Sequence, residues 1–357
     1  MDCGDINISV EFILNQEANQ GGEMEEENLA ASRLKNRHFW LYAVILAIVV
    51  LIAGGIWYFL TQSKDKEKEA ESPGQGGQSS VVEPKDNAGQ YNWSQMSEGP
   101  YRDRVSFATG TSLTSWQDSE KILSEHASVP DVILKDGTLY VYFVDVSEDG
   151  KPEQVGLLKS SDNGKSWSEK QIVIIKGLEN KAAVDPAPYL LDDGRIRLYY
   201  FDISKTRAEG TSNNSIYSAI SSDGANFTEE SGVRFKYPAI YDPDVIKVGD
   251  VWRMYVGTED QKVLLATSQD GLTFAYEGVA FSGGTIPNVI YEGGTYYLFT
   301  GGIEIATSKD GKTFTKTSTR FDSGGLTADP GVAKLADGSY LMVYKTKEGA
   351  VPKPNPQ

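Results

Sequence analysis

Residues 241–256 read YDPDVIKVGDVWRMYV, and four other stretches of the chain repeat this pattern. These stretches are SVPDVILKDGTLYVYF from Ser128, VDPAPYLLDDGRIRLYY from Val184, TIPNVIYEGGTYYLFT from Thr285 and ADPGVAKLADGSYLMVY from Ala328. In each one, two runs rich in apolar residues flank a turn such as Lys-Asp-Gly or Glu-Gly-Gly. An Asp-Gly turn between β-branched and aromatic runs is a strong short-range signal for a β-hairpin. Each stretch therefore predicts two antiparallel strands.

A second pattern alternates with these hairpins. It reads KSSDNGKSW from Lys159, AISSDGANF from Ala219, ATSQDGLTF from Ala266 and ATSKDGKTF from Ala306, with a decayed copy, ATGTSLTSW, from Ala108. Repeats of about 40–60 residues, each with four short strands, are typical of a β-propeller. No amphipathic helical pattern follows Asn92, so we expect an all-β fold. Equivalent loops of a propeller meet at its axis, where residues far apart in sequence share one pocket.

The order of the two patterns predicts how the ring closes. The turn at Ala108 has no hairpin before it, and the hairpin at Ala328 has no turn after it. We therefore predict a five-bladed β-propeller over residues 101–347, in which residues 105–123 form the outer strands of the last blade beside residues 328–346. Closure of this kind removes the exposed sheet edges that promote aggregation.

A segment suited to a membrane precedes the propeller. Residues 39–60 read FWLYAVILAIVVLIAGGIWYFL, carry no charge and have aromatic residues at both ends. This run is long enough to cross a bilayer, and it exceeds the apolar core of a cleaved signal peptide, which is the alternative. We predict one transmembrane helix at 39–61, a disordered cytoplasmic tail at 1–38, a flexible stalk at 62–100 and a C-terminal tail at 348–357. The propeller is then expected outside the cytoplasm, at the cell membrane, and Met24 is an alternative start of the chain.

Composition excludes several classes of function. The formal net charge of −16 disfavours nucleic-acid binding, because such binding depends on Lys and Arg side chains that neutralise phosphates. Cys3 is the only cysteine, and His38 and His126 are the only histidines. Cysteine-based and histidine-rich metal sites are therefore excluded, as is an obvious Ser-His-Asp triad.

The outer turns resemble the Asp-box, or bacterial neuraminidase repeat, of sialidases and other propellers. Ser160, Asp162, Gly164 and Trp167 fit Ser-x-Asp-x-Gly-x-x-Trp, and the next three turns are shortened versions. The resemblance implies a structural role, in which Ser and Asp side chains hold a tight turn away from the active site. The Arg-Ile-Pro motif of sialidases is absent from the sequence, so these turns do not indicate a sialidase.

The inner hairpins resemble those of five-bladed glycoside hydrolases of the arabinanase and β-xylosidase type, over about residues 104–346. In that family a blade-one Asp is the general base, a blade-two Asp tunes the acid, and a blade-three Glu is the general acid. Asp185 matches the blade-two residue. In blade one Val129 occupies the expected position and Asp131 lies two residues further on. In blade three the family's Glu-Gly-Pro is replaced by residues 241–243, Tyr-Asp-Pro.

The candidate site follows from this resemblance and from the position of the acidic residues at strand ends. The candidate catalytic residues are Asp131, Asp185, Asp242, Asp244 and Glu259. The candidate binding residues are Asn288, Asp329 and Tyr241. Two carboxyl groups on opposite faces of a sugar can hydrolyse it, and crowding raises some carboxyl pKa values, as an acid catalyst needs.

The predicted partner is a carbohydrate. No cofactor is expected with certainty, and Ca²⁺ at the propeller axis is a further candidate. Asp before Pro is also a common turn former, so a structural role for each Asp stays open. The alternative function is accordingly a non-catalytic surface propeller that binds a protein or a glycan.

Overall fold

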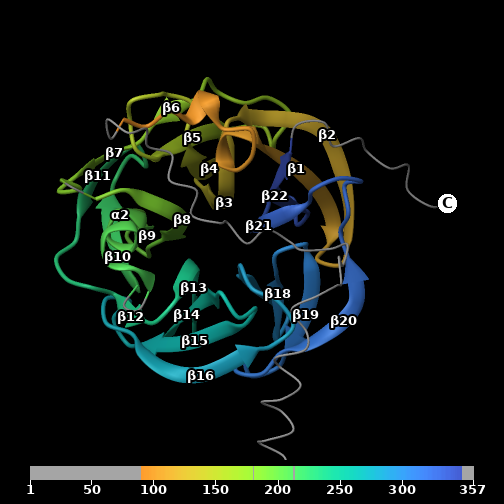
Figure 1. The fold of residues 1–357 in the computed structure, drawn as a ribbon. Coiled ribbons are helices and arrows are strands. Elements are labelled where there is room, and N and C mark those ends of the chain that lie inside the picture. Colours follow the sequence, from red (N-terminus) through yellow and green to blue (C-terminus); the bar gives the residue numbers. More distant parts are fainter. Residues whose placement is uncertain (1–89, 180, 212–213, 348–357) are drawn as a thin grey trace, which may run out of the picture. The chain divides into compact units, whose positions relative to one another are not determined.

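Five β-sheets form a ring around a central axis in the computed structural model, which describes residues 90–179, 181–211 and 214–347 (Figure 1). The predicted all-β, five-bladed propeller is confirmed. Each sheet is one blade, and its first strand in the order below lies nearest the axis. Blade 1 contains β3 (Ala127–Lys135), β4 (Thr138–Asp145), β5 (Gln154–Ser160) and β6 (Gln171–Ile172). Blade 2 contains β8 (Ala183–Leu190), β9 (Ile196–Asp202), β10 (Asn214–Ser221) and β11 (Asn226–Glu229), with β7 (Ile174–Lys176) beside β11 and β12 (Phe235–Tyr237) beside β10.

The remaining blades have four strands each. Blade 3 contains β13 (Ile240–Val248), β14 (Val251–Thr258), β15 (Val263–Ser268) and β16 (Ala275–Phe281). Blade 4 contains β17 (Asn288–Glu292), β18 (Thr295–Phe299), β19 (Glu304–Ser308) and β20 (Thr315–Arg320). Blade 5 contains β21 (Ala328–Lys334), β22 (Tyr340–Lys347), β1 (Asp103–Ser112) and β2 (Ser115–Glu125).

Blade 5 joins the two ends of the described chain. Its strand order is β21-β22-β1-β2, so β1 and β2 from the N-terminal side complete the sheet begun by the last hairpin (Figure 1). The antiparallel register of β1 and β22 runs from Asp103 opposite Lys347 to Gly110 opposite Tyr340. The predicted closure of the ring is confirmed.

Two features of the described chain lie outside the strand prediction. One short helix, α2 (Ile203–Glu209), begins where the Asp202 side chain accepts the Ser204 N–H. The segment before β1, predicted to end the flexible stalk, contains the single turns η1 (Trp93–Gln95) and η2 (Pro100–Arg102). Trp93 is buried, and its indole N–H donates to the Lys151 carbonyl over 2.8 Å. Residues 90–100 therefore pack against blade 1.

The predicted membrane anchor at residues 39–61 lies outside the described residues, as do the two predicted tails and residues 62–89 of the stalk. Among the residues that are described, no helix has the length and apolar character needed to span a bilayer.

Apolar side chains fill the space between neighbouring blades, where Val141 of blade 1 clusters with Leu341 and Val343 of blade 5, for example. A tyrosine hydroxyl from the second strand also joins three pairs of neighbouring blades. These bonds run from Tyr142 to the Gly224 carbonyl (2.8 Å), from Tyr199 to Gly271 (2.8 Å) and from Tyr255 to Gly311 (2.7 Å). Each bond ties one blade to the outer turn of the next.

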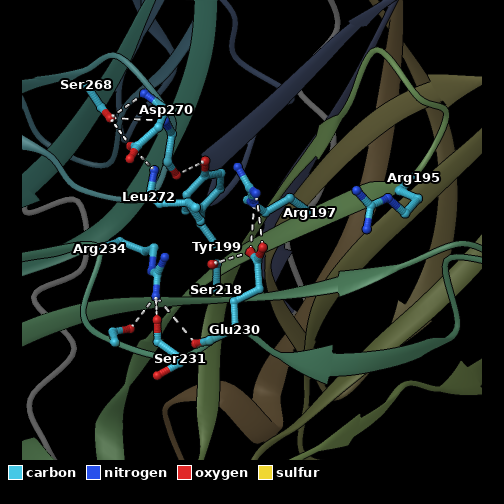
Figure 2. A network of polar contacts seen from close by, with 12 residues as sticks. Arg195, Arg197, Tyr199, Ser218, Glu230, Ser231, Arg234, Ser268, Asp270 and Leu272 are labelled. Carbon is cyan, nitrogen blue, oxygen red and sulfur yellow. Dashed lines mark hydrogen bonds and ion pairs between the residues drawn. The ribbon is translucent and has the colours of Figure 1, made fainter.

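The outer turns are held by their own side chains. In the turn of blade 3, Ser268 Oγ accepts the Gly271 N–H, and Asp270 Oδ1 accepts the N–H groups of Leu272 (2.8 Å) and Thr273 (Figure 2). These bonds lower the pKa of the Asp270 carboxyl. Beside this turn, a buried ion pair joins Arg197 to Glu230, with 2.7 Å between Nε and Oε2 (Figure 2). The turns therefore stabilise the blades from the side away from the axis.

Candidate axial site

At the start of each inner strand, a residue followed by proline has a positive φ. These residues are Val129 (+47°), Asp185 (+53°), Asp242 (+45°), Ile286 (+58°) and Asp329 (+52°). The residue before proline normally takes an extended conformation, so each position stores strain on the order of 1–3 kcal/mol. In four of the five blades the register with the second strand shifts at this point, which is a β-bulge. The bulges bring five equivalent positions to the axis.

These five segments line one pocket. Its walls are the five strained residues, the proline after each of them, and two residues one step further on, Asp131 and Asn288. The cavity volume is about 20 Å³, which is room for one or two waters, and it widens to about 290 Å³ with the open mouth included. Of the residues predicted from the sequence, the pocket brings together Asp131, Asp185, Asp242, Asn288 and Asp329.

Asp185 and Asp242 are in direct contact. The backbone N–H of Asp242 donates to Asp185 Oδ2 over 3.1 Å, and the two carboxyl groups are close enough to affect each other's ionisation. Burial raises the pKa of Asp185 to about 7. Burial and the nearby charges of Asp185 and Asp329 raise the pKa of Asp242 well above its usual range. Because two adjacent buried carboxyl groups do not readily both ionise, the raised pKa values favour one retained proton on this pair near neutral pH.

Asp131 and Asp244 lie on either side of Asn288. The Asn288 amide nitrogen is 3.3 Å from Asp131 Oδ1 and 3.5 Å from Asp244 Oδ1. Asp244 Oδ2 accepts the N–H of Val289 in the next blade over 2.6 Å, and Asn288 Oδ1 accepts that of Val332 in the blade after it over 3.0 Å. Burial raises the pKa of Asp244 to about 7. Burial and the Asp244 charge raise the pKa of Asp131 well above its usual range.

Asp131 lacks the bond to the next blade that Asp244 and Asn288 make. By strand register, the position of blade 2 that matches Asp131 is Ala187, and the residue after it is Pro188, which has no N–H. Asp131 Oδ1 instead accepts the N–H of its own neighbour Val132 over 2.7 Å. The Asp131 side chain is only half-buried and faces the pocket. Of the three equivalent residues Asp131, Asp244 and Asn288, it is therefore the one without a bond to the next blade.

Lys345 is a charged residue of the site that the sequence did not indicate. It lies in β22 opposite Ala328, and its Nζ is 2.6 Å from Asp329 Oδ2. Asp329 is 2% exposed, and its Oδ1 has no hydrogen-bond donor among the described residues. Burial raises the pKa of nearby Asp103 to about 6, while the Lys345 charge acts in the opposite direction. The available signal was a lone lysine directly after the aromatic run of the fifth hairpin.

Three predicted residues do not line the axial pocket, and one of them, Asp244, is buried beside Asn288. The half-buried Tyr241 donates its hydroxyl to the Thr258 carbonyl over 2.7 Å. Glu259 is exposed in the turn after β14. Neither residue contributes to the pocket wall. In the described ranges, no group of three or more His, Cys, Asp or Glu side chains is arranged to hold a metal ion.

No protein-family model matches the chain, and no curated protein matches it. Among solved structures, a GH32 β-fructofuranosidase of Bombyx mori has a TM-score of 0.50 at 17% identity, over 71% of this chain and 60% of that chain. A family 117 glycoside hydrolase of Zobellia galactanivorans has a TM-score of 0.49 at 14% identity, over 70% of this chain and 91% of that chain. An α-L-arabinofuranosidase of Clostridium thermocellum has a TM-score of 0.49 at 15% identity, over 60% and 80% of the two chains.

The first of these comparisons shows that this chain and the Bombyx mori protein have a similar fold. This chain spans 60% of the length of the Bombyx mori protein. What the axial pocket can do chemically must therefore be argued from its own groups. Two pairs of carboxyl groups lie in it or beside it, and burial raises the pKa of all four, to about 7 for Asp185 and Asp244 and well above the usual range for Asp131 and Asp242. Carboxyl groups with separated pKa values are the requirement for acid–base chemistry at neutral pH.

Proposed function

We propose that this propeller binds a glycan at the axial mouth and hydrolyses a glycosidic bond there. The observation that carries the proposal is the convergence of partly protonated carboxyl groups from different blades on one open pocket. Glycoside hydrolysis needs one carboxylic acid and one carboxylate, held on opposite sides of the scissile bond.

The proposed acid and base roles follow from which axial carboxyl groups favour their protonated form near neutral pH. The raised pKa of Asp131 favours its protonated form and its side chain faces the pocket, so it donates that proton to the leaving oxygen. Asp185 ionises near pH 7 and removes a proton from the water that attacks the anomeric carbon. This differs from the resemblance, which makes the blade-one Asp the base. Asp242, bonded to Asp185, fixes the orientation of that carboxylate.

A second candidate is a propeller that binds a glycan or a protein without turnover. Two observations favour it. The enclosed cavity of about 20 Å³ admits no sugar ring, so a sugar must sit at the mouth, and the blade-three position of the acid lacks a Glu. The axial carboxyl groups would then only bind the ligand.

A hydrolysis screen separates these candidates. Full-length protein is incubated with nitrophenyl glycosides and with plant and bacterial polysaccharides, beside the Asp131→Asn, Asp185→Asn and Asp310→Asn variants. Turnover that disappears in the two axial variants and persists in Asp310→Asn, an outer-turn control, supports hydrolysis. Binding without turnover supports the second candidate. Turnover unchanged in both axial variants would show that the axial site is not the active site.

We also propose that the outer turns are Asp-boxes with a structural role and that the propeller is held at the cell surface by residues 39–61. The Ser and Asp bonds within the turns, remote from the pocket wall, support the first point. The uncharged apolar run supports the second. Extraction of native membranes with carbonate, followed by protease treatment of intact cells, tests the anchor and its orientation. Release into the supernatant would contradict it.

A further inference from the structure

The axial pocket offers a ligand mainly acceptors, and the protonated carboxyl of Asp131 is the donor that the proposed function requires there. Each of its five segments contains a proline on the wall, and a proline has no N–H to donate. The only amide side chain on the wall, that of Asn288, already donates to Asp131 and Asp244. The proton between Asp185 and Asp242 is engaged within that pair. A ligand group that enters the cavity must therefore bring its own donors.

The charge of the site favours a cation. The acidic and basic groups in and around the pocket are six carboxyl groups and two amines: Asp103, Asp131, Asp185, Asp242, Asp244, Asp329, Lys345 and Lys347. Lys345 is bound to Asp329 Oδ2, which leaves Asp329 Oδ1 buried without a hydrogen-bond donor among the described residues. No arginine or lysine lies on the pocket wall and Lys345 is already paired with Asp329, so a carboxylate or phosphate of a sugar would find no cationic partner on the wall.

We propose that the axial cavity binds a primary ammonium group, and that the glycan recognised at this site therefore contains an unacetylated amino sugar. An ammonium group has three donors and no acceptor, which complements a wall of acceptors. Its size is close to that of a water molecule, and the cavity of about 20 Å³ holds one or two waters. The sugar ring then lies in the open mouth with its amine at the axis. This inference rests on the proposed glycan binding and specifies the class of sugar.

A linked release of protons follows from this geometry. The free protein keeps a proton on the Asp185–Asp242 pair, and an ammonium group placed against this pair and Asp329 favours the ionised form of the pair. Binding of an amino sugar therefore releases protons to the buffer. Binding of a neutral sugar at the mouth releases none.

The test is titration calorimetry of full-length protein near pH 6, where the probe amines are protonated, in two buffers of different ionisation enthalpy. The probes are glucosamine, N-acetylglucosamine, glucose and ethylamine. We expect glucosamine to bind about tenfold or more tightly than the other two sugars and to release protons. We expect this preference to be lost in Asp329→Asn and in Asp185→Asn, and to persist in Asp310→Asn, which removes the same charge from an outer turn.

The outcomes are distinguishable. If neutral sugars bind as well as glucosamine, or if glucosamine releases no proton, the ammonium inference is wrong while glycan binding stands. If neither the sugars nor ethylamine bind, both the inference and the proposed glycan binding are wrong for these monosaccharide probes. If ethylamine binds with proton release and no sugar binds, the ammonium site is supported and the glycan proposal fails. Asp185→Asn keeps the assay informative if Asp329→Asn leaves Lys345 unpaired and does not fold.

Discussion

We expect the Asp185→Asn variant to release about one proton fewer on unfolding than the wild type, so that its unfolding free energy depends less on pH. In the folded protein, burial raises the pKa of Asp185 from 3.8 to about 7. Between those values the unfolded chain loses this proton while the folded protein keeps it. Stability therefore falls as pH rises, by up to about 1.4 kcal/mol per pH unit and by about 4 kcal/mol in all, and the loss is complete above the folded pKa. The substituted side chain carries no such proton and can still accept the Asp242 N–H.

The assay is denaturant unfolding of the full-length protein at intervals from about pH 5 to about pH 8. We expect the unfolding free energy of the wild type to fall across this range, and that of Asp185→Asn to fall less steeply. Asp310→Asn is the control. Hydrogen bonds from the N–H of Lys312 and from Ser308 lower the pKa of Asp310, so its stabilisation is constant over this range. That variant should lose stability equally at every pH. Parallel curves for Asp185→Asn and the wild type would show that Asp185 is already ionised at the acid end, and the interpretation of the axial pair would be wrong.

Three further substitutions test the links between blades and site. Gly331→Ala puts a Cβ 2.5 Å from the Asp131 Cα, a backbone atom. We expect the free energy of unfolding to fall by about 1–3 kcal/mol and axial binding to weaken. An unchanged melting temperature would contradict this. Tyr255→Phe removes the donor to the Gly311 carbonyl and should cost about 1–3 kcal/mol with axial binding intact, so that a selective loss of binding would count against the interpretation. Pro188→Ala gives blade 2 a backbone N–H that can donate to Asp131, and it should lower the pKa of that carboxyl in an NMR titration. An unchanged titration would mean that the proline is not the reason why Asp131 lacks a hydrogen bond to the next blade.

The fold could be predicted from the sequence because each blade repeats the same local signals. A turn such as Lys-Asp-Gly fixes a hairpin within a few residues, and the spacing of the outer turns gives the repeat. Ring closure was also predictable, because the unpaired half-repeats at the two ends of the propeller can complete a single blade together. The short helix α2 was not predicted, because seven residues capped by Asp202 carry too few periodic positions to show a pattern.

The residues that line the site were predictable where they occupy equivalent positions of the repeat, and not where they depend on strand register or on the conformation of a turn. Asp131, Asp185 and Asp242 share the axis because the repeat places them there. Glu259 follows the second strand of its blade, and its exposure depends on the turn after β14. Lys345 reaches Asp329 from the neighbouring strand through a register that motifs do not encode.

The positive φ values at the bulges help to decide whether the fold requires aspartate at the axial positions. A positive φ is most costly for a β-branched residue and is tolerated best by Asp and Asn among residues other than glycine. Yet Val129 and Ile286 occupy the same strained position as Asp185, Asp242 and Asp329, with φ of +47° and +58°. The backbone of this ring therefore forms without an Asp at the bulge. Burying a carboxyl group in a donor-poor pocket also costs free energy, as the raised pKa of Asp185 records. Because the bulge does not require these carboxyl groups and their burial opposes folding, a ligand at the axis is the better physical account of their presence.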